Sequence, residues 1–319
     1  MKNLNFFLYF CKKLSSPDAD KQNLITESGF RTSDFLNQKP ETEMKSTKVL
    51  FISQEITPYL PESEMALIGR NLPQGIQEKG KEIRTFMPRY GCINERRNQL
   101  HEVIRLSGMN LVVDDTDHPL IIKVASIQSA RMQVYFIDNE DYFHRKFTLC
   151  DEKGNYFEDN DERSFFFARG VLETVKKLRW APDLIHCHGW ITAFVPILIK
   201  KAYNDDPLFS KSKVIYSIYN DGFDKPLKAN IRNKVLIEGI TKKDVDILKN
   251  PDYVNLTKMA VNFADGVILG SEEINKDVNE HIKSLSKHVL PYQNKETYIE
   301  SFNNFYDQIL NNSIDEKKN

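Results

Sequence analysis

The alternation of short apolar segments with helix-like segments restricts the fold of this chain more than any other feature. "KVLFIS" (Lys48–Ser53) and "DLIHCHG" (Asp183–Gly189) are apolar runs of the length typical of buried parallel strands. "DERSFFFARGVLETVKKL" (Asp161–Leu178) instead has apolar residues at helical spacing. Because strands that alternate with helices build parallel sheets, we predict an α/β fold with a single Rossmann-like, doubly wound, mostly parallel sheet.

The other expected elements follow the same alternation. They are a helix from about Glu62 to Lys79, strands at Glu82–Pro88, Val103–Gly108, Asn110–Asp114, Pro119–Ile127, Met132–Asp138 and Lys213–Asn220, a helix at Thr192–Tyr203 with Pro196 placed to kink it, and a helix followed by a strand in Val254–Ser271.

The last segment predicts a helix with one apolar stripe. The stripe consists of Tyr298, Ile299, Phe302, Phe305, Tyr306, Ile309 and Leu310. A stripe of this width is normally buried, so we expect the helix to pack on the body of the protein. Residues 272–319 are then a closing segment of one domain that spans residues 44–319.

Residues 1–43 differ in character from the rest. The apolar run in "MKNLNFFLYFCKKL" is short for a signal peptide and has no clear cleavage site. Residues 15–43 are polar and aperiodic, which predicts disorder. Met44 lies four residues before the first strand, so residues 1–43 are either a disordered leader or the result of a start codon assigned too early.

Charge and cysteine content exclude several classes of partner. The formal net charge is -1, so there is no basic field for nucleic acid or an anionic membrane surface. The longest apolar runs are far too short to cross a membrane. Four scattered cysteines without a C-x-x-C pair fit a reducing compartment, and we expect a cytoplasmic protein.

Polar and aromatic residues follow the predicted strands directly. The carboxyl ends of parallel strands line the ligand crevice of open α/β sheets, so these residues are expected to face one cleft. They are Ser53–Glu55, Asp138, His188–Trp190, Tyr219 and Asn220. The alternative is that they are ordinary polar loop residues. Zinc needs three or four ligands, and His186 and His188 have no apparent third, so we predict no metal. Nothing in the sequence indicates a cofactor.

Seven ordered segments resemble the N-terminal half of the catalytic region in bacterial glycogen synthases and plant starch synthases. They are "KVLFISQEITPYL", "MPRYG", "VYFIDN", "FFFARGVLE", "PDLIHCHGWITAFVP", "VIYSIYN" and "FADGVILGS", and they cover about Lys48 to Ser271. The resemblance implies one half of a GT-B glycosyltransferase. Enzymes of this family transfer glucose from ADP-glucose, or sometimes UDP-glucose, to the end of an α-1,4-glucan. The matching positions, which the resemblance places in the substrate cleft, are Glu55, Tyr90, Asp138, His188, Trp190 and Asn220.

The departures from the family pattern fall where the sugar nucleotide would bind. The family turn after the first strand reads roughly E-V-A-P-F-A-K-T-G-G-L-G-D, and its lysine meets the donor phosphates. Here Pro61 stands for that lysine, Ser63 and Glu64 stand for the paired glycines, and Ala66 and Leu67 follow in place of the third glycine and the aspartate. Pro61 and the glutamates were expected to start the next helix.

Two further motifs are changed. H-C-H-D-W-H-T-A of the family is "HCHGWITA" here, so Gly189 stands for the aspartate and Ile191 for the sugar-contacting histidine. Tyr219 stands for the histidine of T-I-H-N. We also expect the second GT-B domain to be missing, because about 48 residues after Ser271 are too few for it.

These departures predict a synthase-like domain that is inactive alone and does not bind sugar nucleotide alone. Two alternatives remain open on the sequence. The chain is a glucan-binding or regulatory partner in glycogen metabolism, or it is the N-terminal subunit of a split synthase whose second domain is a separate protein. A structural role without ligand is the simplest rival to both.

Overall fold

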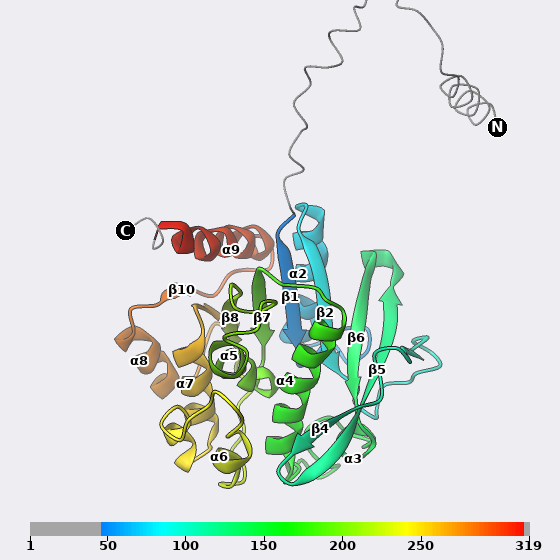
Figure 1. Cartoon of the computed structure of the whole chain (residues 1–319). Coiled ribbons are helices and arrows are strands. Elements are labelled where there is room, and N and C mark those ends of the chain that lie inside the picture. Colours follow the sequence, from blue (N-terminus) through cyan, green and yellow to red (C-terminus); the bar gives the residue numbers. More distant parts are fainter. Residues whose placement is uncertain (1–45, 316–319) are drawn as a thin grey trace, which may run out of the picture. The chain divides into compact units, whose positions relative to one another are not determined.

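The computed structural model describes residues 46–315 (Figure 1). The predictions for residues 1–43 therefore lie outside the described residues. The described strands are β1 (Lys48–Ser53), β2 (Glu82–Pro88), β3 (His101–Glu102), β4 (Met109–Val113), β5 (Thr116–Ile127), β6 (Met132–Asp138), β7 (Leu184–His188), β8 (Lys213–Ile218), β9 (Gly266–Leu269) and β10 (His288–Leu290).

These strands form one sheet in the order β10-β9-β8-β7-β1-β2-β6-β5-β3, and β4 pairs with β5. All neighbours from β10 to β6 are parallel, whereas β3, β4 and β6 each pair with β5 in the antiparallel direction. The prediction of an α/β fold with a mostly parallel sheet is confirmed. The antiparallel margin makes the sheet mixed.

The centre of the sheet contains the point where the strand order reverses. From β1 the chain moves outward through β2 and β6, and it then returns to place β7 on the other side of β1. Open α/β sheets bind ligands outside the carboxyl ends of the strands at such a point. The ends of β1 and β7 are therefore the place to look for a site.

The described helices are α2 (Glu64–Glu78), α3 (Glu140–Phe143), α4 (Asn160–Lys177), α5 (Phe194–Ile197), α6 (Ile231–Lys234), α7 (Tyr253–Phe263), α8 (Lys276–Ser284) and α9 (Tyr298–Asp315). Short 3-10 turns occur at Gln128–Ala130, Trp190–Thr192 and Asp246–Lys249. As predicted, the helix around Pro196 is irregular: α5 gives way to a π-type turn at Leu198–Ala202.

Alternation along the strands sends side chains to two separate cores, one on each face of the sheet. Leu50 and Ile52 of β1 point into the larger core, to which α4, α5 and α7 contribute. Val49 and Phe51 point into the smaller core, which α2 and α9 cover. Figure 1 shows these helices layered on the sheet.

The last helix packs as its stripe predicts. Phe302, Phe305, Tyr306 and Ile309 are buried against β1, β7, β8 and β9, and the other three stripe residues are partly buried. Lys81, which lies directly before β2, forms an ion pair with Asp307 of α9 at 2.9 Å. The closing segment is thus part of the fold, since it supplies one wall of a core.

The structure differs from the sequence predictions in one strand that is absent, one strand that was not predicted and one helix start. Val103–Gly108 is not a strand: β3 ends at Glu102, and Leu106 N–H donates to the Val103 carbonyl at 2.9 Å to close a turn. The short strand β10 was not predicted, because its side chains are largely exposed and show no apolar alternation. The first helix begins at Glu64 rather than Glu62, because Ser63 caps it.

Candidate functional site

A cavity of about 510 Å3 opens where β1, β8 and β9 end. We call it the crevice. Its lining residues are Glu55, Ser63, Glu64, Met65, Tyr219, Asn220, Asp221, Ser271, Glu272 and Glu273. Five of these are carboxylates, and none of the described residues that line it is lysine or arginine. The crevice therefore offers hydrogen-bond acceptors and negative charge, with no cation to hold a phosphate.

Ser63 organises the entrance to α2. Its Oγ accepts a hydrogen bond from Ala66 N–H at 3.0 Å, which caps the helix, and donates to Glu55 Oε2 at 2.7 Å. The Ser63 hydroxyl thus provides a hydrogen-bond partner for an N–H group at the start of α2, and it also holds the Glu55 carboxylate, which lines the crevice. The expectation that Pro61 starts the helix is wrong, since Pro61 precedes this cap.

Glu64 is held from two sides at the mouth of the crevice. Tyr292, in the segment that leads to α9, donates its OH to Glu64 Oε1 at 2.8 Å. Ser271 Oγ donates to Oε2 at 3.5 Å. As the first residue of α2, Glu64 also lies at the positive end of the helix dipole. The position that the family gives to a phosphate-facing glycine is here occupied by a fixed carboxylate.

Gly189 occupies a place that excludes a side chain. Its φ of 82° is in the left-handed region, and a Cβ would lie 2.9 Å from Met65 Sδ and 3.0 Å from Gln54 Oε1. The same Gln54 Oε1 accepts Ile191 N–H at 3.2 Å. Ile191 itself is fully buried. An aspartate at residue 189 would be strained by this φ and would require Met65 and Gln54 to shift, and residue 191 does not line the crevice.

Five crevice residues were not among the sequence candidates, and Asp221 is the most perturbed of them; the others are Met65, Ser271, Glu272 and Glu273. Its Oδ2 accepts Trp190 N–H at 3.0 Å, and its Oδ1 accepts the Tyr253 hydroxyl at 3.3 Å. Burial, with a further contribution from the charge of Glu55, raises the pKa of Asp221 to about 7, although these hydrogen bonds oppose the shift. The sequence signal that could have identified Asp221 is its position directly after Asn220, just beyond the end of β8.

Two histidines lie beneath the crevice. The His186 and His188 rings are 3.8 Å apart between centroids. His186 Nδ1 pairs with the Tyr306 hydroxyl at 2.6 Å and Nε2 with Ser217 Oγ at 2.7 Å, while His188 Nδ1 pairs with the Tyr219 hydroxyl at 2.9 Å. Tyr219, which stands for the family's histidine, thus connects the crevice to this buried pair.

Burial keeps both rings neutral. It lowers the pKa of His188 to about 3 and the pKa of His186 well below its usual 6.5, with the neighbouring His188 adding to the second effect. Neutral imidazoles could bind a metal, but among residues 46–315 no group of three or more His, Cys, Asp or Glu side chains is arranged to hold one.

Asp138 lies in an ion-pair cluster of its own at the end of β6. It is fully buried, 3.0 Å from Lys123 Nζ and 3.2 Å from His144 Nε2, and Arg89 Nε is 3.8 Å away. Lys123 and Arg89 also pair with Glu95. This carboxylate is therefore neutralised by its own neighbours.

The matched residues do not all reach the crevice. Glu55 and Asn220 line it, whereas Tyr90, Asp138, His188 and Trp190 do not. Tyr90 and Trp190 are buried, and burial raises the pKa of the Tyr90 hydroxyl. Two of the six positions that the family resemblance placed in the substrate cleft therefore line the cavity.

None of the helices within residues 46–315 is both long and apolar enough to cross a membrane.

Comparisons with known proteins identify the family of this chain. The family model described as starch synthase catalytic domain matches residues 48–289. Glycogen synthase of Chlorobium luteolum is 35% identical over 222 residues, which are 69% of this chain and 45% of that protein. Glycogen synthase of Chlorobium phaeobacteroides is 34% identical over 238 residues, 72% of this chain and 49% of that protein. The chain thus spans about half the length of the curated relatives it matches.

A solved structure shows the same fold. The catalytic domain of starch synthase IV from Arabidopsis thaliana, bound to ADP and acarbose, superposes with a TM-score of 0.63 at 20% identity, over 78% of this chain and 52% of that one. Sequence match, relatives and fold lead to one conclusion: this chain belongs to the starch synthase catalytic domain family.

Proposed function

We propose that this glycogen/starch synthase-like domain binds α-glucan in the crevice and does not by itself transfer glucose from a sugar nucleotide. The observation that carries the proposal is the lining of the crevice, which has five carboxylates and no lysine or arginine among the described residues. A nucleoside diphosphate sugar carries its negative charge on the diphosphate. A glucan is uncharged, and its hydroxyl groups can donate hydrogen bonds to carboxylate and amide oxygens.

The geometry of α2 supports the first half of the proposal. Phosphate sites at helix starts use free backbone N–H groups and the helix dipole. Here the Ser63 hydroxyl occupies the Ala66 N–H group, and the Glu64 carboxylate occupies the dipole end. Pro61 has no N–H to donate. A phosphate would have to displace these groups and approach two carboxylates, Glu55 and Glu64.

Support for a glucan comes from the relatives and from the chemistry of the crevice. Curated relatives are glycogen synthases, and the starch synthase IV structure holds acarbose, an oligosaccharide analogue. Asn220 and Ser271 add an amide and a hydroxyl group to the carboxylates that line the cavity, and Tyr219 adds an aromatic ring. Ligand sites typically combine such a small set of polar groups with aromatic walls.

Retardation of the protein in native gels that contain glycogen tests glucan binding. We expect retardation that grows with glycogen concentration and that the substitution Asn220→Ala weakens, because Asn220 is exposed at the crevice. The matched control is Asn204→Ala, an equally exposed asparagine outside the crevice. Identical migration with and without glycogen would overturn the binding role and leave a structural one.

A second candidate function is that of the N-terminal half of a two-part synthase. The observation that favours it is the match to 45% of the length of the glycogen synthases, within a GT-B fold that needs two halves to hold the donor near the acceptor. Its test is transfer of labelled glucose to glycogen after the C-terminal half of a related synthase is added. Activity that appears only in the mixture would favour this candidate.

A further inference from the structure

Three cavities lie in a row along the loop that follows β8. The crevice shares Asn220 and Glu273 with a second cavity of about 530 Å3. That cavity shares Phe223 with a third, of about 260 Å3, which Tyr156, Phe157 and Leu227 also line. The shared residues show that the three cavities are neighbours, and we call this row of cavities, which begins at the crevice, the groove.

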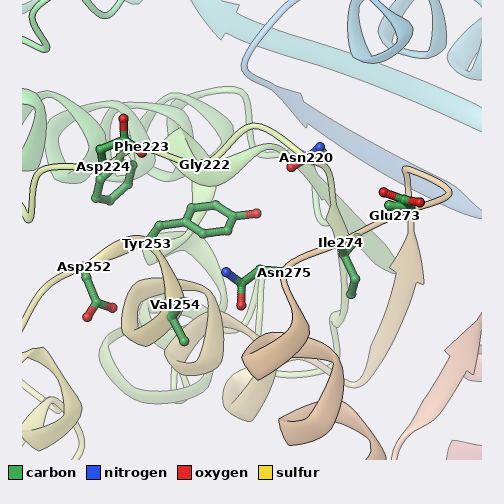
Figure 2. Close-up of a pocket in the computed structure, with 10 residues that line it drawn as sticks. All are labelled: Asn220, Gly222, Phe223, Asp224, Asp252, Tyr253, Val254, Glu273, Ile274 and Asn275. Atoms are coloured by element: carbon green, nitrogen blue, oxygen red, sulfur yellow. The ribbon is translucent and has the colours of Figure 1, made fainter.

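The middle cavity has many polar side chains in its lining. Figure 2 shows Asn220 and Glu273 at the end that adjoins the crevice, Phe223 and Asp224 at the other, and Tyr253 between them. Asn275 caps α8 through Oδ1, which accepts from Asp277 N–H at 2.9 Å. Its Nδ2 is therefore not used by the cap, and it remains a donor beside the cavity.

Three of the eight residues that line the far cavity are aromatic. Tyr156, Phe157 and Phe223 form what we call the aromatic shelf. Tyr156 is half-buried, with its ring centroid 6.1 Å from that of Phe223 and its hydroxyl donating to the Gly222 carbonyl at 3.3 Å. A bridge to Cys150 also holds its backbone. The shelf is thus a fixed surface, because both the ring and the main chain of Tyr156 are anchored.

We propose that this groove holds a linear, uncharged sugar polymer, with its nearest units in the crevice and a distant unit stacked on Tyr156 of the aromatic shelf. The inference rests on the proposed function, because it takes the same α-glucan, and it adds that the chain recognises length. Sugar rings expose flat C–H faces that pack on aromatic rings, while their hydroxyl groups pair with amides and carboxylates.

Charge along the groove favours a neutral occupant. The first two cavities are lined by carboxylates and, among the described residues, by no lysine or arginine, so an anionic polymer is repelled there. The shelf adds Lys225 and Lys228, and Lys228 already lies 3.9 Å from Glu158. A basic peptide would meet these lysines at the far end. An uncharged chain meets no opposing charge at either end.

The three cavities of the groove also differ in volume. Ligand pockets commonly measure about 300–1,000 Å3, and the first two cavities fall in that range. The third, at about 260 Å3, is too small to be a complete site but large enough to hold one end of a longer ligand. Affinity should therefore rise with chain length until the ligand reaches Tyr156.

Calorimetric titration of the full chain with maltotriose and with maltoheptaose tests the inference. We expect maltoheptaose to bind about tenfold more tightly, and the substitution Tyr156→Ala to abolish that difference while leaving maltotriose binding unchanged. Tyr156→Phe, which keeps the ring, should retain the preference. Phe263→Ala is the matched control: Phe263 is also partly buried against the core, but lies at the opposite end of α7 from the groove.

The outcomes separate this inference from the proposed function. Equal affinity for the two sugars, or an undiminished preference in Tyr156→Ala, would overturn the extended groove and leave glucan binding in the crevice intact. If the chain binds neither sugar, or binds a lysine-rich peptide in their place, the proposed function fails and the inference fails with it.

Discussion

Replacing Tyr306 with phenylalanine would remove one hydroxyl group from the contact between α9 and the sheet. That hydroxyl pairs with His186 Nδ1 at 2.6 Å, and both side chains are fully buried. The other nitrogen of His186 is already paired with Ser217. Phenylalanine keeps the ring and its packing, so the substitution isolates the hydrogen bond and leaves Nδ1 without a partner.

The expected cost follows from the burial of His186. A buried polar group left unpaired costs about 1–3 kcal/mol. For domains of roughly 150–250 residues, each kcal/mol of lost unfolding free energy lowers Tm by about 2–4 °C. This domain is slightly larger, so we expect a fall of about 2 °C for each kcal/mol. Urea denaturation should therefore show a lower midpoint at an unchanged slope, with a loss of unfolding free energy of about 1–3 kcal/mol.

Tyr292→Phe provides the comparison. It also removes a tyrosine hydroxyl from a hydrogen bond, to Glu64, but Tyr292 is half-buried and water can replace the bond. We expect a change within about 0.5 kcal/mol there. If Tyr306→Phe were as mild as Tyr292→Phe, the buried pairing would not stabilise the fold as argued, and the role assigned to Tyr306 would be wrong.

Three further predictions concern the ends of the chain and its titration. Removal of residues 1–43 should leave Tm unchanged, and a fall of several degrees would show that they pack on the domain. Deletion of Glu296–Asn319 should give insoluble or molten protein, because four buried side chains at about 1.5–3 kcal/mol each approach the whole stability of a domain; a soluble, cooperatively unfolding truncation would refute this. Asp221→Asn should be more stable than the parent at pH 8, since the pKa of Asp221 is raised from 3.8 to about 7 and its ionisation destabilises the fold as pH rises through that window. In that variant stability should fall as pH drops from about 6.5 toward 3, because His186 and His188 are buried neutral and bind protons more readily once unfolded; urea midpoints between pH 3 and 8 that stay flat or rise on acidification would contradict it.

Local patterns were enough to predict the framework of the fold. The stripe from Tyr298 to Leu310 predicted a docked helix because apolar residues at helical spacing need a core, and the core of β1, β7, β8 and β9 is where they pack. The rule of strand ends brought Glu55, Tyr219 and Asn220 to the crevice, because parallel strands end at one edge of the sheet.

What the sequence could not supply depends on neighbours distant along the chain. Asp138 is neutralised by Lys123 of the antiparallel strand β5 and by His144, a cluster that no motif records. Asp221 became notable only through burial beside Trp190 and Tyr253. The pairing of His186 with Tyr306, 120 residues further along the chain, likewise leaves no local signal in the sequence.

Titration of ADP-glucose into the purified chain, with labelled-glucose transfer to glycogen measured on the same sample, tests the central claim most directly. A carboxylate such as Glu64 about 5 Å from one phosphate charge, at an effective dielectric of about 20, opposes binding by roughly 3 kcal/mol, and the missing lysine removes an attraction of similar order. A net penalty of about 4 kcal/mol weakens binding nearly a thousandfold. We predict no measurable heat and no transfer by the unmodified chain. Replacing Pro61, Ser63 and Glu64 with the family's lysine and glycines should give at most weak phosphate binding, and still no transfer. Micromolar binding of ADP-glucose, or transfer by the unmodified chain alone, would contradict the account.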